Sequence, residues 1–549
     1  MMLSDKAIRA VDEGRALLAC LQAGALGPLP PSAAVTAVHA IRSFGTTGAI
    51  ATVSALRHRE LTALIDERGP LTYTEVDARS NAIANAWRSQ GLRAEHCVGI
   101  MCRNHRGLLD AVFAAAKCGV RIVMLNYDFA GPQVAAVVER EEVDLLVHDD
   151  EYTDSVGGLD RFAFGRWRSW ADDAGPDTLE SLIETGDPGV VPAPGKHASV
   201  VILTSGTTGT PKGAQRPDPR SLTPMGGLLA KVPFRGREVT ECCVPMFHAL
   251  GFTHAILAVS FGSTLIIRRR FDARATLDSL ARHRATAMIV APIMLQRLLD
   301  TEPNPRQGHD LSHLRIIFVA GSQLGASLCR RAMQAFGPVL YNLYGSTEVA
   351  YATIATPDEL RREPGSVGSI VRGARVEIRG DNGELLGPDE TGRIFVANSF
   401  QFQGYTDGRT KNTINGLMAS GDVGHLNSLG LLFIDGRDDD MIVSGGENIY
   451  PAEVEETLTA HPDIVEAAVI GIADDQFGQR LCAYVVPASG AHLTAQDIRD
   501  HVKANLARFK VPRHVVFLDE LPRNPTGKIV KRALPSAEPG QRGDRVGRG

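Results

Sequence analysis

The chain has 549 residues, of which 44% are hydrophobic and 22% are charged. These fractions are close to those of folded globular proteins and exclude a largely disordered or collagen-like chain. With domains of about 150 residues as the usual unit, the length predicts two or three domains. The 58 basic and 63 acidic residues give a net charge of −5, so the chain lacks the basic field that attracts nucleic acid, and we expect no nucleic acid partner.

Eight cysteines are scattered along the chain without the clustering typical of a zinc site, and we interpret them as reduced thiols of a cytoplasmic protein. The first residues carry mixed charges, including Asp5, Lys6 and Arg9, which a secretory signal peptide does not. The longest apolar stretch, residues 107–125, is interrupted by three charged residues, whereas a membrane span needs about 20 nearly uncharged ones. We therefore interpret it as a helix followed by a buried strand.

Two amphipathic helices are predicted at the N-terminus, over residues 4–21 and 33–56, because apolar residues recur there at helical spacing. Gly and Pro residues between positions 24 and 31 separate them. Our main interpretation is an N-terminal extension, residues 1–59, that packs on the body of the protein. The alternative is a surface that contacts a membrane or a partner.

From residue 71 onward, helical segments alternate with short β-rich runs. Strands separated by helices predict an α/β fold with a large N-terminal domain of parallel sheets flanked by helices. Ligands then bind at the carboxyl ends of the strands. The predicted strands are residues 98–101, 122–125, 145–148, 200–204, 265–267, 288–290 and 316–319.

Beyond residue 372 the pattern changes twice. Turns rich in Gly and Asp first separate brief strands, which indicates a β-rich subdomain. After residue 438, strands near 465–469, 482–486 and 515–518 and a helix over 495–507 predict a small α+β C-terminal domain. We therefore divide the chain into the extension 1–59, a large domain 60–438, a small mobile domain 439–536 and a flexible tail 537–549.

The most informative local pattern is a loop that follows the apolar run 200–203. Its three glycines, five hydroxyl side chains and one lysine offer N–H, hydroxyl and ammonium donors, which suit the oxygens of a polyphosphate. The spacing of the glycines differs from that of the Walker motif. We predict a phosphate-binding loop that includes Thr204, Ser205, Gly206, Thr207, Thr208, Gly209 and Lys212.

This loop resembles the signature of the adenylate-forming superfamily, which contains acyl- and aryl-CoA synthetases, luciferases and the adenylation domains of peptide synthetases. Further motifs of that superfamily follow in the expected order up to residue 528, and the overall pattern is most similar to a bacterial fatty-acyl-CoA ligase. They are Tyr344-Gly-Ser-Thr-Glu348, Ser420-Gly-Asp422, Gly436-Arg-Asp-Asp439, Ser444-Gly-Gly-Glu-Asn-Ile-Tyr-Pro451 and Pro525-Thr-Gly-Lys528.

The resemblance implies a reaction with ATP and Mg²⁺ in which a carboxylic acid becomes an acyl adenylate. Lys528 is then the residue that reaches the carboxylate and the α-phosphate, where a cation offsets the repulsion between two anions. Thr347 and Glu348 join it as catalytic residues, and Glu348 supplies a hard oxygen ligand for Mg²⁺. For the nucleotide, Tyr344 offers a flat face to adenine, Asp422 accepts from the ribose hydroxyls and Arg437 donates to the sugar or its phosphate.

The second half-reaction implied by the resemblance is thioester formation with coenzyme A. The small domain is expected to rotate about the hinge residue Asp439, so that one site serves both steps. Gly445 and Gly446 would line the tunnel for pantetheine because a backbone without side chains permits close approach. We predict that the nucleotide end of CoA is bound by Phe509, Lys510 and Arg513, because their side chains can stack on it and pair with it.

The acid itself is expected to be a small molecule with an apolar body. His248 and Gly251 belong to a segment that borders the acyl pocket in the superfamily, and Ala320 and Gly321 form the expected opposite wall. Because residues 319–323 contain no Asp or Lys to bind an amino acid, an apolar monocarboxylate is favoured. The resemblance to bacterial fatty-acyl-CoA ligases implies a medium- or long-chain fatty acid.

Three alternatives stay open at the level of the sequence. The first is an aryl acid, which the same residues would fit. In the second, a fatty-acyl-AMP ligase loads a carrier protein instead of CoA. The third, a non-catalytic binder of nucleotide or acyl ligands, is disfavoured because Lys528, Glu348 and Asp422 are all present. Peripheral contact with a membrane and assembly into a homodimer are also left open.

A substitution at the hinge tests the two-step scheme. We expect Asp439→Pro to spare one half-reaction and to impair the other, because proline fixes φ and restricts rotation of the small domain. Pyrophosphate release measures the first half-reaction, and conversion of supplied acyl adenylate with CoA measures the second. An equal loss of both would contradict the role of Asp439 as a hinge.

Overall fold

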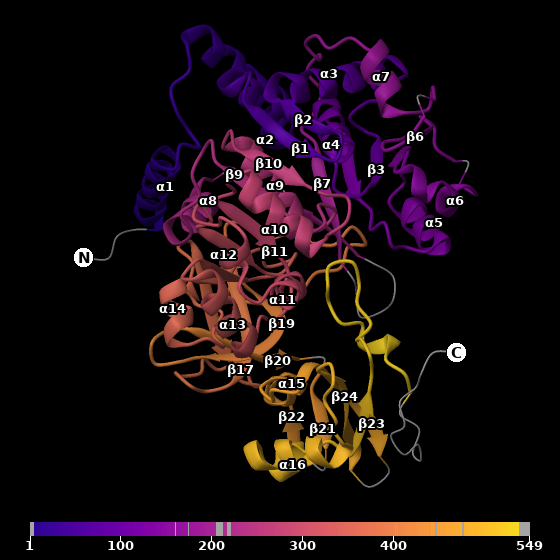
Figure 1. Cartoon of the computed structure of the whole chain (residues 1–549). Helices are drawn as coiled ribbons and strands as arrows, with labels where there is room; N and C mark the ends of the chain where they lie inside the picture. Colours follow the sequence, from indigo (N-terminus) through magenta and orange to yellow (C-terminus); the bar gives the residue numbers. More distant parts are fainter. Residues whose placement is uncertain are drawn as a thin grey trace.

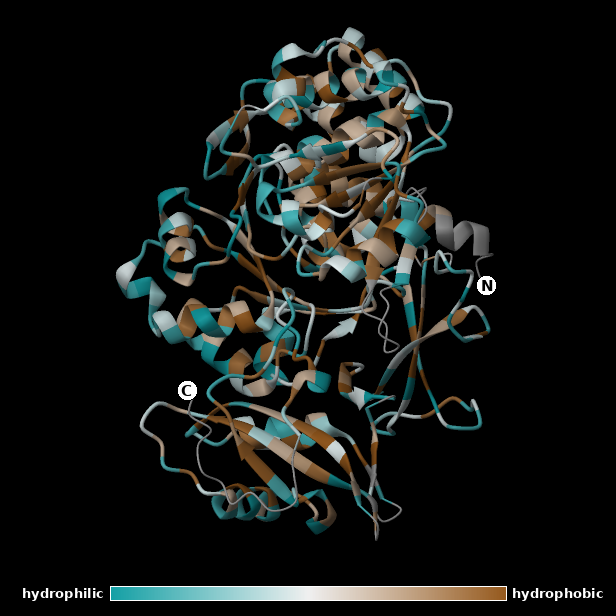
Figure 2. Ribbon diagram, turned by 90° about the vertical axis from the view of Figure 1, so that its right-hand side faces the viewer, coloured by the Kyte–Doolittle hydropathy of each residue, from teal (hydrophilic) through white to brown (hydrophobic). Residues whose placement is uncertain are grey.

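The structure is a computed structural model of the whole chain. It describes residues 5–536 apart from 160, 174, 205–211, 217–220, 401, 403, 439, 445–446 and 475–476. Figure 1 shows a large lobe and a smaller C-terminal lobe beneath it, with a loop of the small lobe that rises toward the large one. Figure 2 shows that the strands inside the large lobe are mostly hydrophobic, whereas outer helices and loops carry many hydrophilic residues.

Two helices form the N-terminal extension, as the apolar periodicity predicts. They are α1 (Asp5–Gln22) and α2 (Pro31–His58). Helix α1 packs on α8 (Thr223–Lys231), and α2 packs on α3 (Tyr73–Ser89), α4 (Arg106–Cys118) and α9 (Ala249–Ser260). The predicted packing of this extension on the body of the protein is therefore confirmed.

The large lobe is built on two sheets whose central strands are parallel. The smaller sheet has the order β6-β5-β3-β4-β7-β8, and its last pair is antiparallel. Strands β3, β4 and β5 are almost wholly buried, as expected for a parallel sheet covered on both faces. Its strands are β3 (Cys97–Met101), β4 (Arg121–Met124), β5 (Leu145–His148), β6 (Arg166–Arg168), β7 (Ser199–Thr204) and β8 (Lys212–Arg216).

The larger sheet has nine strands in the order β15-β14-β13-β12-β11-β9-β10-β1-β2. It is parallel from β13 to β1, and antiparallel strands extend it at both edges. Its strands are β1 (Thr62–Asp66), β2 (Gly69–Thr72), β9 (Val239–Cys242), β10 (Thr264–Ile267), β11 (Ala287–Val290), β12 (Ile316–Val319), β13 (Leu340–Tyr344), β14 (Thr353–Ala355) and β15 (Ser369–Ile370).

Helices connect the parallel strands, which confirms the predicted α/β class. All seven predicted strands in this region coincide with observed ones to within about a residue at each end. The remaining helices of the large lobe are α5 (Gly131–Arg140), α6 (Thr153–Val156), α7 (Leu179–Thr185), α10 (Ala273–Arg282), α11 (Pro292–Thr301), α12 (Pro305–Gly308), α13 (Ala326–Phe336) and α14 (Pro357–Arg362), with a 3₁₀ turn η1 (Asp150–Tyr152).

The apolar stretch 107–125 forms helix α4 and strand β4, as predicted. Every residue of α4 is buried, including three charged ones, of which Arg106 is paired with Asp66 of β1. Asp110 is paired with Arg79 and Lys117 with Asp77, at 2.8 and 2.7 Å, so each buried charge has a partner of opposite sign. Within the described part of the chain, no helix is both long enough and apolar enough to cross a membrane.

The predicted β-rich subdomain is an antiparallel sheet with the order β16-β17-β19-β18, and β20 pairs with β19. The β18–β19 hairpin turns at Asn415 and Gly416, which both have positive φ, as a two-residue Asn-Gly turn requires. The β19–β20 hairpin places Asp422 directly opposite Arg437. Its strands are β16 (Ala374–Arg379), β17 (Gly392–Asn398), β18 (Thr413–Ile414), β19 (Leu417–Leu426) and β20 (Leu432–Arg437).

The C-terminal lobe has its own sheet and a core of its own, centred on residues such as Val454, Val469 and Val485. The predicted α+β pattern is confirmed, although the helix expected over 495–507 ends at Asn505. The elements are β21 (Ile442–Ser444), β22 (Glu447–Ile449), α15 (Pro451–Thr459), β23 (Ile464–Asp474), β24 (Gly478–Pro487), α16 (Ala495–Asn505), η2 (Arg508–Lys510), β25 (His514–Phe517) and η3 (Lys531–Ala533).

Candidate active site

A cavity of about 1650 Å³ lies at the carboxyl ends of parallel strands of the nine-stranded sheet and reaches the C-terminal lobe. His248 from the loop after β9, Ile293 at the start of α11, Ala320 directly after β12 and Tyr344 at the end of β13 form part of its wall. This is the edge at which open α/β sheets bind ligands, as the sequence predicts. Because sites for a single small ligand usually measure about 300–1,000 Å³, the cavity has room for more than one.

The loop after β13 carries the acidic centre of the site. Glu348 is buried, and its two carboxylate oxygens accept hydrogen bonds from Tyr405 (2.8 Å) and Ser346 (2.9 Å). Burial alone would raise the pKa of Glu348, but the Lys411 ammonium and these hydroxyl donors hold it below its usual value. The carboxylate is therefore ionised at neutral pH and available to a cation. Thr347 also lines the cavity.

A second anionic group is held between two strands. The Tyr344 hydroxyl donates to Oδ2 of Asp422 at 2.7 Å, and Arg437 donates to Oδ1 at 3.2 Å. Burial and the neighbouring carboxylate raise the pKa of Tyr344 well above its usual value, so its hydroxyl keeps the proton that it donates. All three residues line the cavity, and the carboxylate of Asp422 is fixed in orientation by donors on both oxygens.

Lys528 comes from the C-terminal lobe and lines the same cavity. Its loop docks on the large lobe, because a Cβ added to Gly527 would lie 2.2 Å from Cγ2 of Ile293 in α11. The Lys528 side chain is exposed to the cavity, yet the surrounding protein lowers the pKa of its ammonium group. Arg437 lowers this pKa further, whereas Asp422 and Glu348 act in the opposite direction.

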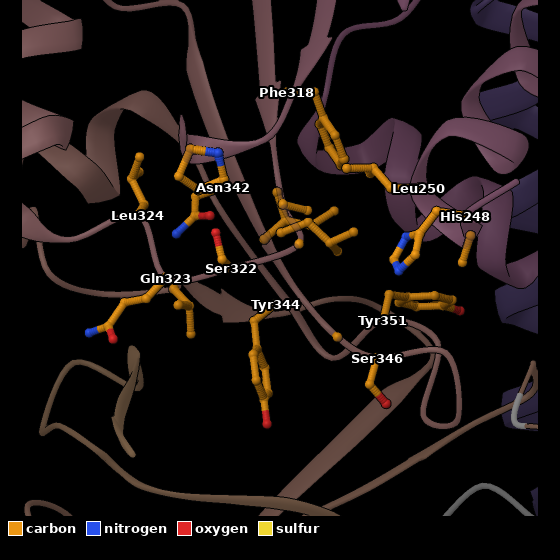
Figure 3. Close-up of a pocket in the computed structure, with 18 of the residues that line it drawn as sticks. His248, Leu250, Phe318, Ser322, Gln323, Leu324, Asn342, Tyr344, Ser346 and Tyr351 are labelled. Carbon is orange, nitrogen blue, oxygen red and sulfur yellow. The ribbon is translucent and has the colours of Figure 1, made fainter. Parts of the chain in front are cut away.

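The part of the cavity beside His248 is mostly apolar. Figure 3 shows His248, Tyr351 and Ser346 on one side of the pocket and Phe318, Ser322 and Leu324 on the others. Burial and the nearby Lys528 ammonium lower the pKa of His248 to about 4, so its imidazole is neutral at physiological pH. A neutral ring suits the predicted role as a wall of the acyl pocket. Ala320 and Gly321 lie on the wall as predicted.

Several residues of the site were not predicted from the sequence. Lys411 lines the cavity, donates to the carbonyl of Ser420 at 2.6 Å and acts on the pKa of Glu348. The chain has only ten lysines, so the rarity of this residue type was a usable signal. Tyr351 and Asn342 also line the cavity but follow no pattern that separates them from core residues.

Other predicted site residues lie elsewhere. Gly251 packs under the start of α9, where a Cβ would lie 2.3 Å from the Pro245 carbonyl oxygen, so it shapes the backbone rather than the cavity wall. In the C-terminal lobe, Phe509 is exposed and Lys510 is paired with Glu453. Neither these two residues nor Arg513 is among the described residues that line the cavity.

The loop predicted to bind phosphate is described only at its two ends. Thr204 ends β7, and Lys212 begins β8 with its ammonium 5.4 Å from the centre of the Tyr405 ring. Ser205, Gly206, Thr207, Thr208 and Gly209 lie outside the described residues, as do the hinge residue Asp439 and the glycines Gly445 and Gly446. β7 thus delivers the loop at its carboxyl end, as the sequence predicts.

Among the residues that the structure describes, two places offer ligands to a metal ion. One is Glu348, whose ionised carboxylate faces the cavity. The other is a buried cluster of Cys102, His105 and Asp149, whose ligand atoms lie within 4.8 Å of one another. In that cluster His105 and Asp149 are joined at 2.6 Å, and Asp149 also accepts from Ser169, so its groups are satisfied within the protein. Glu348 is therefore the better candidate for a catalytic ion.

Two family profiles match the chain. The profile of the AMP-binding enzymes matches residues 52–406, and that of their C-terminal domain matches residues 453–528. The chain belongs to the AMP-binding enzyme family. It is an AMP-forming acid–CoA ligase, and its substrates are ATP, CoA and a small carboxylic acid.

Relatives of this AMP-binding enzyme are named after different acids. The indoleacetate–CoA ligase of Aromatoleum aromaticum is 33% identical over 482 residues, which cover 84% of this chain and 92% of that protein. The fatty acid–[acyl-carrier-protein] ligase ScoC of Streptomyces coeruleorubidus is 28% identical over 494 residues, 86% of this chain and 92% of that protein. The o-succinylbenzoate CoA synthetase of Bacillus subtilis, solved with its acyl adenylate, has a TM-score of 0.77 and 26% identity and covers 90% of this chain and 99% of that one.

Replacement of Lys528 separates the two half-reactions of the ligase. We expect Lys528→Ala to slow acyl-adenylate formation by about a hundredfold or more, because the cation beside the reacting anions is lost. Conversion of supplied acyl adenylate with CoA should continue at close to the wild-type rate. Pyrophosphate release and thioester formation measure the two steps.

Lys503→Ala is the matched control, since Lys503 is an exposed lysine of α16 in the same lobe. It should leave both steps unchanged. Equal losses in both half-reactions of Lys528→Ala would show that Lys528 has no special role in adenylation.

Proposed function

We propose that this ligase activates a medium- or long-chain fatty acid. In the first step a carboxylate oxygen bonds to the α-phosphorus of ATP, the bond to pyrophosphate breaks, and fatty-acyl-AMP forms. In the second step the sulfur of CoA bonds to the acyl carbon, AMP leaves with the bonding electron pair, and the thiol proton is released. The observation that carries the choice of acid is the apolar lining of the cavity along helix α9.

Helix α9 borders the cavity from its first residue to its last. The apolar lining residues of α9 are Ala249, Leu250, Phe252, Ile256 and Leu257, and the polar residues Thr253, His254 and Ser260 lie between and after them. At 1.5 Å per residue, the 12 residues of α9 extend over about 18 Å. Carbon–carbon bonds of about 1.5 Å in a zigzag advance about 1.3 Å per carbon, so this length accommodates about 14 carbons. An indole or benzoate ring would fill only the near end.

The charged residues take separate roles in the first step. Asp422 would accept hydrogen bonds from the ribose hydroxyls. Arg437 would donate hydrogen bonds both to Asp422 and to the nucleotide. Glu348 would hold Mg²⁺, whose charge would offset that of the triphosphate. Lys528 would approach the carboxylate and the α-phosphate from the small lobe. Tyr344 would hold the Asp422 carboxylate and offer its ring to adenine.

The second step requires a rearrangement of the small lobe. In the structure Lys528 occupies the cavity, and this arrangement suits adenylation. Rotation about Asp439 would withdraw Lys528 and bring Gly445 and Gly446 to a pantetheine tunnel. Phe509, Lys510 and Arg513, which lie apart from the cavity here, would then meet the nucleotide end of CoA.

Another acid and another acyl acceptor are candidates, because the names of two relatives mention them. An aryl acid is favoured by the similarity to an indoleacetate–CoA ligase. Transfer to a carrier protein is favoured by the similarity to a fatty acid–[acyl-carrier-protein] ligase. A non-catalytic binder is disfavoured, because Lys528, Glu348 and Asp422 all line one cavity.

A substrate panel distinguishes these candidates. We expect pyrophosphate release to rise with chain length from butyrate to myristate and to be low for benzoate and indoleacetate, since each buried methylene adds about 0.8 kcal/mol of binding. Addition of CoA should give a fatty-acyl thioester detectable by mass. Faster pyrophosphate release with the aromatic acids would show that the substrate is an aryl acid rather than a fatty acid. Acyl-AMP that does not react with CoA would favour a carrier protein as the acceptor.

We also propose a cytoplasmic location with peripheral contact to lipid. Long-chain acids partition into bilayers, so contact with a lipid surface would bring the substrate to the enzyme. The support is a set of apolar side chains that remain exposed on α1, α2 and the loop between them, namely Val11, Leu17, Leu18, Leu21, Leu26, Val35, Val38 and Ile41.

Cosedimentation with liposomes tests the lipid contact. Val35→Asp combined with Val38→Asp should reduce the bound fraction severalfold, because carboxylates on α2 oppose insertion into the bilayer. The matched control is Val190→Asp, which changes a side chain that is 87% exposed outside this extension. If the wild type does not bind liposomes, or the double variant binds equally well, the contact is absent.

A further inference from the structure

The N-terminal extension is fastened to the body of the ligase at a fixed place. Glu13 of α1 accepts hydrogen bonds from the start of α8, namely from the backbone N–H of Leu222 (3.0 Å) and the hydroxyls of Ser221 and Thr223. Hydrogen bonding to Ser221 lowers the pKa of Glu13 despite its partial desolvation. The two helices are in close contact, since a Cβ on Gly226 would lie 2.4 Å from Ala16.

The loop between α1 and α2 is also held. Arg57 donates to the carbonyl oxygens of Ala25 and Gly24, and the N–H of Gly236 donates to Ala23 at 2.6 Å. Helix α2 bends at Gly45, whose φ is 69°. The backbone therefore has a defined path from the end of α1 to the part of α2 beyond the bend.

This same path borders the far end of the large cavity. Residues from α1, the loop and α2 join the wall there, together with Met225 and Leu228 of α8 and Phe261 after α9. His248 lies before the first residue of α9 and Phe261 after its last, so the two mark opposite ends of the part of the cavity that α9 lines. The contributing residues of the extension are Glu13, Cys20, Ala25, Leu26, Thr46, Thr47 and Ile50.

We propose that the N-terminal extension forms the distal wall of the acyl site and sets the longest chain that the ligase accepts. The inference rests on the proposed function, since it requires an acid whose apolar chain extends along α9. The family profile begins at residue 52, so α1, the loop and most of α2 lie outside it. This wall is therefore a feature of the chain's own sequence rather than of the family's shared motifs.

The chemistry of the wall suits the end of an alkyl chain. Cys20, Ala25, Leu26 and Ile50 present apolar surface, the Glu13 carboxylate is held by the residues at the start of α8, and the remaining two lining residues are threonines. Leu26 is exposed. Each methylene that is buried there strengthens binding by roughly fourfold, and each methylene that a larger side chain displaces loses that gain. A bulky substitution in the wall should therefore shift the chain-length optimum without effect on the nucleotide.

Two variants fill the distal end from the loop, Ala25→Phe and Leu26→Trp. We expect each to lower kcat/KM for myristate by about tenfold or more, and to leave kcat/KM for octanoate and KM for ATP within about twofold of wild type. The matched control is Val190→Trp, because Val190 lies outside the extension, is 87% exposed and is not among the described residues that line the cavity. It should leave the whole profile unchanged.

The outcomes separate this inference from the proposed function. Wild-type activity on long-chain acids combined with an unchanged profile in both variants overturns the distal wall alone. Equal losses for octanoate and myristate also overturn it, because they indicate damage to the fold or to the reacting end. A wild-type enzyme without activity on any of the aliphatic acids overturns both the proposed function and the inference of a distal wall. Thermal unfolding checks that each variant folds, and Leu26→Trp at the exposed rim serves if Ala25→Phe does not.

Discussion

The proposed chemistry depends on one constraint: an ammonium group of the small lobe must reach a site in the large lobe. Adenylation joins a carboxylate to a phosphate, and two anions approach only if a cation lies between them. The large lobe contributes carboxylates from Glu348 and Asp422 and cations from Arg437 and Lys411. Lys528, which we propose as that cation, comes from the other lobe, so in this proposal the strands of the large lobe act as a fixed frame and the chemistry depends on docking of the small lobe.

The loop that carries Lys528 keeps its shape by its own hydrogen bonds. The Asn524 side chain accepts from the Lys528 N–H at 2.9 Å and from the Thr526 hydroxyl at 2.8 Å. Arg523 donates to the Gly527 carbonyl at 2.6 Å and pairs with Glu466 of β23 at 3.1 Å. Because the loop is tied to the sheet of the small lobe, a rotation of that lobe would move Lys528 as part of a rigid body, which favours accurate placement of the ammonium group.

Much of the fold could be predicted from sequence periodicity. The seven parallel strands, the two N-terminal helices and the α+β C-terminal domain all come from strong local patterns, and buried charges such as Lys117 did not mislead because their partners lie on neighbouring helices. The residues within motifs, Tyr344, Glu348, Asp422, Arg437 and Lys528, meet in one cavity. The sequence did not place Lys411 and Tyr351 in the site, because contacts between segments far apart in the chain decide which side of a loop faces the cavity.

The acid is harder to infer than the chemistry for a physical reason. The reacting atoms are the same for indoleacetate and for a fatty acid, so the motifs around Lys528 carry no information about the rest of the substrate. An apolar pocket discriminates mainly by volume, at only about 1–3 kcal/mol per methylene, and volume is set by many ordinary side chains. Here those side chains belong to α8, α9 and the N-terminal extension. Sequence motifs thus identify the reaction, whereas the packing of apolar helices against one another determines how much space the acyl chain has.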